Sequence, residues 1–314
     1  MRIGLIDVDG RNFPNIPLMK LSAWHKQQGD MVEWYMPFSE RYDLVYKSKV
    51  FSFSPDFDDC INADRVVRGG TGYCIDLVGG REVFHREKDT PLPQEVEHIY
   101  PDYSLYPALT KDTAYGFLTR GCPRGCDFCI VGEKEGRCSV KVADLSEFWR
   151  GQKNIVLCDP NILACKDWRD LLQQCIDSKA WIDYNQGLDI RMMTEEKAEM
   201  LCRTKIKEIH FAWDRYEDKD IVLPKLKMFA ETEGKKPHGH SAIVFTLTNH
   251  GTTIEQDLER IYTLREMGYW PYVMVYDKAH ASQTHRAIQG WVNNRFVFAK
   301  CERFEDYRPS HVVD

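Results

Sequence analysis

The stretch TAYGFLTRGCPRGCDFCIVG, residues 113–132, decides the fold. Its first residues predict a short β-strand, and the strand leads into a loop that holds Cys122, Cys126 and Cys129. Three of the eleven cysteines of the chain therefore fall within one short loop. Glycine and proline surround them, as a tight backbone turn requires.

Strand and helix patterns alternate regularly after this loop. Apolar segments that end in polar residues predict further strands within residues 154–161, 181–191, 208–215, 240–251 and 269–278. Helical patterns lie between them, and one carries apolar residues at helical spacing: Ile254, Leu258, Ile261 and Leu264. Six βα units in a row predict an α/β fold, and we expect a partial (β/α)6 TIM-like barrel over residues 113–300.

In parallel α/β folds, functional groups collect where the strands end. Besides the cysteine loop, this rule selects the polar residues at the predicted strand ends. They are Asp159, Asn161, Asn185, Gln186, Asp189, Arg191, Asp214, Asn249, His250, Asp277 and Lys278. We expect these side chains to face one cavity.

The segment before residue 113 predicts a smaller domain and a linker. Residues 1–82 contain short strand patterns and one helical pattern, which favour a Rossmann-like parallel sheet. Residues 83–112 are rich in proline and charge without a sustained period, and we interpret them as a linker. Residues 301–314 are assigned to a C-terminal tail.

Composition bounds the class of protein. The chain has 314 residues, 43% of them hydrophobic, which is enough for a large core. Its formal net charge of −6 gives no general attraction for nucleic acid. No apolar run is long enough for a membrane span, and Asp7 and Asp9 interrupt the N-terminus where a signal peptide is apolar. We expect a cytoplasmic protein with reduced thiols, because the cysteines show no regular pairing.

The cysteine spacing leaves two kinds of metal site open. Structural zinc takes a closed shell of four ligands, and here the fourth candidate is Cys138, nine residues after Cys129. A zinc-stabilised binding module is therefore one alternative. A 4Fe-4S cluster held by three thiolates keeps one iron open to a ligand that is not protein, and the loop favours this interpretation.

The CxxxCxxC spacing, placed after the first strand of a βα series, resembles the signature of the radical S-adenosylmethionine superfamily. The sequence TRGCPRGCDFC is most similar to that of the branch whose members carry a cobalamin-binding or related Rossmann-like domain before the barrel. The resemblance implies a 4Fe-4S cluster on Cys122, Cys126 and Cys129. It also implies S-adenosylmethionine as co-substrate and a one-electron donor such as flavodoxin or ferredoxin.

The resemblance also suggests residues that hold S-adenosylmethionine. Phe128 matches the aromatic position beside the adenine, and Asn249 lies in TNHGTT, which resembles the turn against the adenosyl group. The family's Gly-Gly-Glu-like segment is replaced here by LCDPN, which offers Asp159 or Asn161 as acceptor for the methionine amino group. Arg191 is a donor for the methionine carboxylate, or else forms a structural salt bridge. TNHGTT also fits a helix start, with Thr252 or Thr253 as N-cap.

The front domain lacks the histidine of the cobalamin loop, since the sequence after the first predicted strand is DVDGRNFPN. A cobalamin-dependent radical methyltransferase is therefore an alternative without its usual cobalt ligand. The expected activity is reductive cleavage of S-adenosylmethionine followed by hydrogen abstraction from a substrate. The sequence does not identify that substrate.

Overall fold

The computed structural model describes residues 1–10, 12–79, 81–234, 237 and 241–308. Residues 309–314 of the predicted tail lie outside these ranges. The chain divides into two compact units. One comprises Met1–Gly116 with Ala143–Ile155, and the other comprises Phe117–Val142 with Val156–Asp314. The parallel sheets described below confirm the predicted α/β class.

A four-stranded parallel sheet forms the centre of the first unit, in the order β2-β1-β3-β4. Its strands are β1 (Arg2–Asp7), β2 (Met31–Trp34), β3 (Tyr42–Ser48) and β4 (Ala63–Gly69). Helix α1 (Ile16–Gln27) begins at Asn15, whose side chain accepts a hydrogen bond from the backbone N–H of Leu18 at 3.2 Å. The helix packs Leu18 and Leu21 against the β1 side chains, so that this end of the chain has its own core.

The predicted linker, residues 83–112, contributes to this core. It includes helices α2 (Gln94–Glu97) and α3 (Pro107–Thr110), and it follows an antiparallel hairpin of β5 (Ile75–Val78) and β6 (Arg81–Phe84). Val96 of α2 is buried in one cluster with Ile3 and Leu5 of β1. An apolar side chain thus anchors a segment whose charge and proline content suggested a loop.

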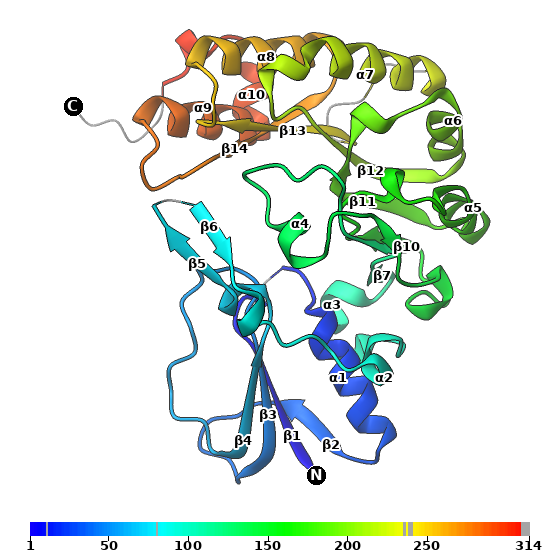
Figure 1. Cartoon of the computed structure of the whole chain (residues 1–314), viewed down its shortest axis with the longest axis vertical. Coiled ribbons are helices and arrows are strands. Elements are labelled where there is room, and N and C mark those ends of the chain that lie inside the picture. The colour runs from blue at the N-terminus through cyan, green and yellow to red at the C-terminus, as the bar shows by residue number, and fades with distance from the viewer. Residues whose placement is uncertain (11, 80, 235–236, 238–240, 309–314) are drawn as a thin grey trace. The chain divides into compact units, whose positions relative to one another are not determined.

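A six-stranded sheet runs in the order β14-β13-β12-β11-β10-β7 (Figure 1). Its strands are β7 (Thr113–Gly116), β10 (Asn154–Leu157), β11 (Trp181–Leu188), β12 (Lys205–Ala212), β13 (Ala242–Thr248) and β14 (Trp270–Val275). Strands β11 to β14 pair in parallel. A short hairpin of β8 (Thr119–Arg120) and β9 (Val140–Lys141) encloses the cysteine loop and α4 (Val131–Lys134).

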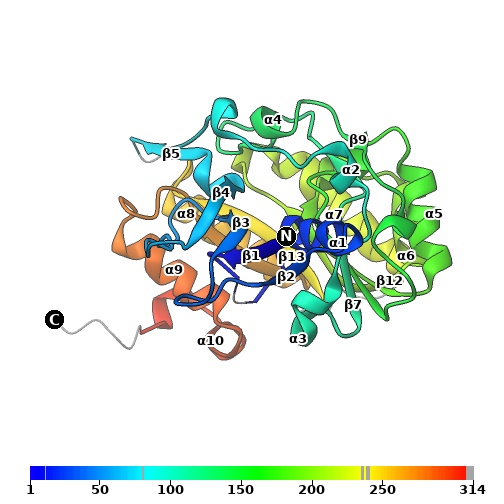
Figure 2. The same cartoon turned by 90° about the horizontal axis from the view of Figure 1, so that it is seen from below.

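Helices follow the strands of this sheet, as the sequence pattern predicts. They are α5 (Trp168–Ser178), α6 (Glu195–Arg203), α7 (Lys219–Glu233), α8 (Ile254–Met267), α9 (Gln283–Asn293) and α10 (Arg295–Lys300). Figure 2 shows α5 and α6 outside β12. Phe211 of β12 packs edge-on against Phe229 of α7, with ring centroids 5.1 Å apart. Alternating residues of the strands therefore point toward the helices or away from them.

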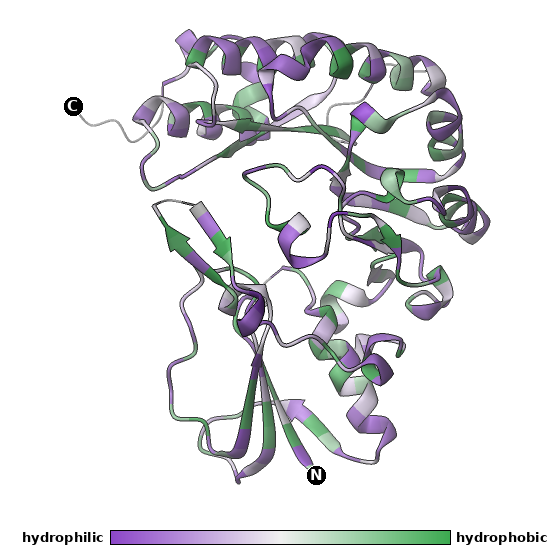
Figure 3. Ribbon diagram, viewed as in Figure 1, coloured by the Kyte–Doolittle hydropathy of each residue, from purple (hydrophilic) through white to green (hydrophobic). Residues whose placement is uncertain are grey.

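The helices of the second unit are amphipathic, which is visible as alternating hydrophilic and hydrophobic bands in Figure 3. Helix α8 begins with a capping box. The Thr253 hydroxyl accepts from Gln256 N at 3.3 Å, and the Gln256 side chain accepts from Thr253 N at 3.0 Å. This confirms the predicted helix start at TNHGTT. The aromatic C-terminal region is largely core, since Trp291 and Phe298 are buried together with Val273.

Within the described ranges, none of the helices combines the length and the apolar character that crossing a membrane requires.

Candidate functional site

The cysteine loop is a compact turn held by its own backbone. Cys122 N donates to Gly136 O at 3.1 Å, and Cys129 N donates to Cys126 O at 3.1 Å. Gly121 has φ +83°, and a Cβ atom there lies only 2.2 Å from the carbonyl oxygen of Cys138. No other residue type fits this position without moving the loop, so the sequence RGC specifies the local fold.

The three thiols of the loop lie within electrostatic reach of one another. Desolvation raises the pKa of both Cys126 and Cys129, and negative charge on Cys122 acts in the same direction on each. In the part of the chain that the structure describes, no three His, Cys, Asp or Glu side chains converge as a metal-binding group. Burial thus favours the protonated thiols of Cys126 and Cys129, and binding of a metal requires their deprotonation.

Asp159 is fully engaged by the backbone that precedes the cysteine loop. Its buried carboxylate accepts from Leu118 N at 3.1 Å, from Thr119 N and from the Thr119 hydroxyl at 2.6 Å. Burial raises the pKa of Asp159 to about 6, although these hydrogen bonds work in the opposite direction. This side chain ties the end of β10 to the start of the loop.

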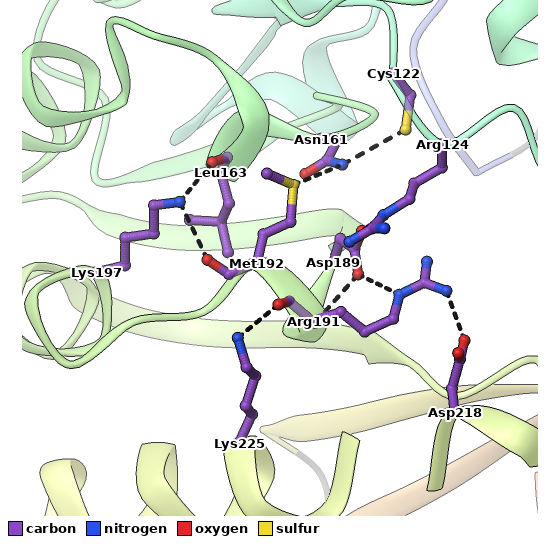
Figure 4. Close-up of polar contacts among 10 residues, drawn as sticks. All are labelled: Cys122, Arg124, Asn161, Leu163, Asp189, Arg191, Met192, Lys197, Asp218 and Lys225. Carbon is purple, nitrogen blue, oxygen red and sulfur yellow. Dashed lines mark hydrogen bonds and ion pairs between the residues drawn. The ribbon is translucent and has the colours of Figure 1, made fainter. Parts of the chain in front are cut away.

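Asn161 has a different role in the same segment. Its amide nitrogen lies 3.5 Å from Cys122 Sγ and 4.0 Å from Met192 Sδ (Figure 4). Its amide oxygen, Oδ1, is buried and has no hydrogen-bond partner in the described residues. An acceptor without a donor stands directly beside the first cysteine, which is the arrangement that a bound N–H group completes.

Asp189 and Arg191 form a charged network after β11 (Figure 4). Arg191 Nε donates to Asp189 Oδ1 at 2.8 Å, and its Nη1 donates to Asp218 Oδ2 at 2.6 Å. Arg124, from the cysteine loop, also pairs with Asp189. Burial opposes ionisation of Asp189, yet the two guanidinium groups hold its pKa below the usual value. The network fixes the cysteine loop to the end of the third strand of the series.

Arg191 combines both predicted roles. Two carboxylates hold it, as a structural salt bridge does, but its Nη2 has no hydrogen bond with the described part of the chain. Its positive charge acts on Cys126. One N–H edge of this guanidinium is thus available to an anion near the cysteines.

Asp214 follows β12 and faces the same loop. Its carboxylate accepts from Leu247 N at 3.2 Å, and its negative charge acts on Cys126 and Cys129. Burial raises the pKa of Asp214 to about 6, with a smaller opposing contribution from Arg260. The structure therefore places Asp214 at the cysteine loop.

Phe128 belongs to an aromatic group that spans the loop and the end of β13. Its ring meets the ring of His250 edge-on at 5.4 Å, and His250 lies 4.6 Å from the ring of Tyr276. Asn249 has a left-handed backbone, φ +61°, and its Nδ2 donates to Tyr276 O at 2.8 Å. Asn249 thus shapes the turn, while the rings beside it offer an apolar surface.

Gln186 differs from the other predicted residues because its side chain is exposed. It lies in an irregular part of β11, where the pairing with β12 shifts between Tyr184 and Leu188. No hydrogen bond connects Gln186 with another described residue of the site.

Two arginines of the site were not among the predicted residues. Arg124 is part of the CPRGC sequence, and a charged residue between two cysteines was the available signal. Arg260, on α8, is completely buried and donates to Trp213 O at 2.6 Å and to Leu247 O at 2.7 Å. Nothing in the sequence distinguishes it from an exposed helical arginine.

Neither a scan against models of protein families nor a search of curated protein sequences found a match to this chain. The functional assignment therefore depends on the residues themselves.

Proposed function

We propose that the chain is a radical S-adenosylmethionine enzyme whose 4Fe-4S cluster is held by Cys122, Cys126 and Cys129. The observation that carries the proposal is a single loop that holds three cysteines beside the buried, unpartnered Asn161 Oδ1. Three thiolates ligate three irons of a cubane and leave the fourth iron to a co-substrate. The donor set thus fits this cluster better than it fits a closed zinc site.

The residues around the loop match the functional groups of S-adenosylmethionine. Asn161 Oδ1 would accept from the α-ammonium group, and Arg191 Nη2 would donate to the α-carboxylate. The rings of Phe128 and His250 would pack against the adenine. Four further residues complete the predicted set. Asp189, Asp214 and Asn249 shape the site beside the cysteine loop or contribute charge to it, and Gln186 is exposed to solvent.

When bound and reduced, the cluster supplies the electron that splits S-adenosylmethionine into methionine and a 5′-deoxyadenosyl radical. The protein orients the co-substrate and keeps water from the reacting atoms. We further propose that the six strands of the β14-to-β7 sheet curve into a partial (β/α)6 barrel, and that the segment before it in the sequence is a Rossmann-like domain. A flavodoxin or ferredoxin in the cytoplasm is the expected electron donor.

Cobalamin does not enter the proposal. Residues 8–15, between β1 and α1, contain no histidine to ligate cobalt.

The test is anaerobic reconstitution with iron and sulfide, compared between wild type, Cys126→Ala and the exposed control Cys60→Ala. We expect about four irons per wild-type chain and formation of 5′-deoxyadenosine with dithionite. Cys126→Ala should lose both, and Cys60→Ala should keep both. Stoichiometric zinc without iron supports the zinc-stabilised module instead, and equal behaviour of the two variants overturns the proposal.

A further inference from the structure

A second polar group lies on strands β11 and β12 of the six-stranded sheet. It consists of Asp183 on β11 with Glu208 and His210 on β12. His210 precedes Phe211, which packs on α7, so His210 points to the opposite face of the sheet. We call this the inner face. Asp183 pairs with Glu208 across the two strands and lies 3.8 Å from His210.

His210 presents a hydrogen-bond acceptor on this face. Its Nδ1 lies 2.9 Å from the carbonyl oxygen of Tyr184, and a carbonyl only accepts, so Nδ1 carries the proton. Burial lowers the pKa of His210, which keeps the ring neutral at pH 7. Its Nε2 therefore carries a lone pair. That atom makes no hydrogen bond within the described ranges, and Glu208 Oε2 lies 3.8 Å away.

Asp183 adds a second unsatisfied acceptor. Its Oδ1 is buried without a hydrogen-bond partner in the described residues. Burial, reinforced by the charge of Glu208, raises the pKa of Asp183 to about 7. Lys207 acts on it with opposite charge but forms no ion pair with it in the part of the chain described. Two carboxyl groups and an imidazole thus share a site in which no Lys or Arg of the described residues forms an ion pair with either carboxylate.

Aromatic rings border the same group. Phe245 of β13 stacks on His210 with centroids 5.1 Å apart and an angle of 18°. Tyr272 of β14 meets Phe245 edge-on at 5.9 Å and is 43% exposed. Gly187, with φ +94°, leaves room for the Phe245 ring, because a Cβ there lies 3.3 Å from it. Carboxylates beside aromatic faces are typical of sites for organic cations.

We propose that the inner face binds an organic cation with several N–H donors, an ammonium or amidinium group, through Asp183, Glu208 and His210. This inference rests on the proposed function. Together with that function, it implies that the substrate of the radical is a cationic molecule. The N–H groups satisfy His210 Nε2 and Asp183 Oδ1, and Phe245 and Tyr272 pack against the apolar part of the ligand. The positive charge offsets the two carboxylates.

The test is calorimetric titration of the full-length protein with benzamidine, a planar amidinium with an aromatic ring, and with its neutral analogue benzamide. We expect benzamidine to bind and benzamide to bind at least about tenfold more weakly. Glu208→Gln and Asp183→Asn should each weaken benzamidine by about tenfold or more. The control Glu231→Gln, an exposed carboxylate on α7, should leave the affinity unchanged.

The readout is independent of S-adenosylmethionine cleavage, so the Cys126→Ala protein serves as well as wild type. Benzamidine binding by Cys126→Ala supports the cation site even where the proposed radical activity fails. Equal affinity for benzamidine and benzamide overturns the cation site, and so does unchanged affinity in Glu208→Gln. The Glu208 side chain is 34% exposed, so Glu208→Gln tests the site at a less buried carboxylate than Asp183, whose side chain is 14% exposed.

Discussion

The nitrogen and the oxygen of the Asn161 side-chain amide lie in different environments. The nitrogen faces sulfur atoms and the oxygen faces a space without a donor. Burial removes the water that would otherwise donate a hydrogen bond to this oxygen, and no protein donor replaces it. A ligand that donates to the oxygen removes the free-energy cost of leaving it unsatisfied. The side chain is therefore the most direct probe of S-adenosylmethionine binding in this chain.

We predict that Asn161→Ala raises the KM for S-adenosylmethionine in 5′-deoxyadenosine formation by about tenfold, because it removes an acceptor for a charged donor. Iron content should stay at the wild-type level, since Asn161 is not a proposed ligand. Gln173→Ala, on the exposed side of α5, is the matched control. An unchanged KM in Asn161→Ala contradicts the proposed role.

Asp183 makes stability depend on pH. Its pKa is about 7 in the folded chain and near 3.8 when unfolded, so the folded state binds the proton more tightly. Stability from this group is present at low pH and is lost as pH rises from about 4 to about 7. The charges of Glu208 and Lys207 act on the pKa of Asp183 in opposite directions, Glu208 raising it and Lys207 lowering it.

We predict that Asp183→Asn has a higher Tm than wild type at pH 8 and that this difference shrinks toward pH 5. The amide cannot ionise, so the variant avoids a buried charge at high pH. Thermal unfolding followed by circular dichroism measures the difference at both pH values. A constant Tm difference across this range contradicts the raised pKa.

At the scale of elements, the ends of β12 and β13 are joined by a guanidinium. Arg260 reaches from α8 to the carbonyl oxygens of Trp213, Asp214 and Leu247, and its Nη2 pairs with Asp257 at 2.6 Å. Both charged side chains are completely buried. Asp214 follows β12, and the TNHGTT turn follows β13. The Arg260–Asp257 ion pair therefore stabilises two segments of the candidate site.

We predict that Arg260→Met lowers the free energy of unfolding by about 3–5 kcal/mol, because it leaves the buried Asp257 carboxylate without its guanidinium partner, with the His285 ring 3.7 Å away. The double variant Asp257→Asn with Arg260→Met should recover part of this loss. Arg169→Met, at an exposed pair with Glu196, should cost no more than about 1 kcal/mol. Chemical denaturation measures all three. Equal losses for Arg260→Met and Arg169→Met contradict the assigned role.

Helices and strands could be predicted well from the sequence, because the spacing of apolar residues shows which side chains are buried. The predicted stripe of α8 is an example: Ile261 and Leu264 are fully buried. The stripe omitted Asp257 and Arg260, which share the buried face at the same spacing. Charged residues at helical spacing also occur on exposed faces, and only the carbonyls of β12 and β13 show that these two are internal.

The candidate site was predictable as a set of positions but not as a set of contacts. The strand-end rule placed Asp159, Asp189 and Asp214 correctly at one end of the sheet. It did not show that Asp159 is occupied by backbone N–H groups, or that Asn161 is the unsatisfied neighbour. Such assignments depend on distances between segments far apart in the sequence.

On the scale of the whole molecule, the two compact units do not follow the order of the chain. Residues 143–155 come after the cysteine loop but belong to the first unit. Phe148 is buried, its ring occupies the space beside Gly116, and its carbonyl accepts from the Tyr103 hydroxyl at 2.6 Å. The first unit is therefore completed only by a segment that follows the cysteine loop in the sequence.

We predict that Phe148→Ala speeds hydrogen exchange of the β1–β4 amides more than that of the β12 and β13 amides. The missing ring leaves a cavity that costs about 3–5 kcal/mol in the unit that holds it. Phe296→Ala, at a side chain that is 84% exposed, is the control and should change neither. Uniform acceleration throughout the chain contradicts the division into two units.

Asp189 has a consequence for how variants of the site combine. One carboxylate receives Arg124 from the cysteine loop and Arg191 from its own strand end. When either arginine is replaced, the other no longer shares the Asp189 carboxylate. The free-energy effects of the two single substitutions are therefore not additive. A substitution at one arginine is thus partly compensated by the other. A substitution at Asp189 instead removes the shared partner of both, and Arg191 then keeps only its ion pair with Asp218 among the described carboxylates.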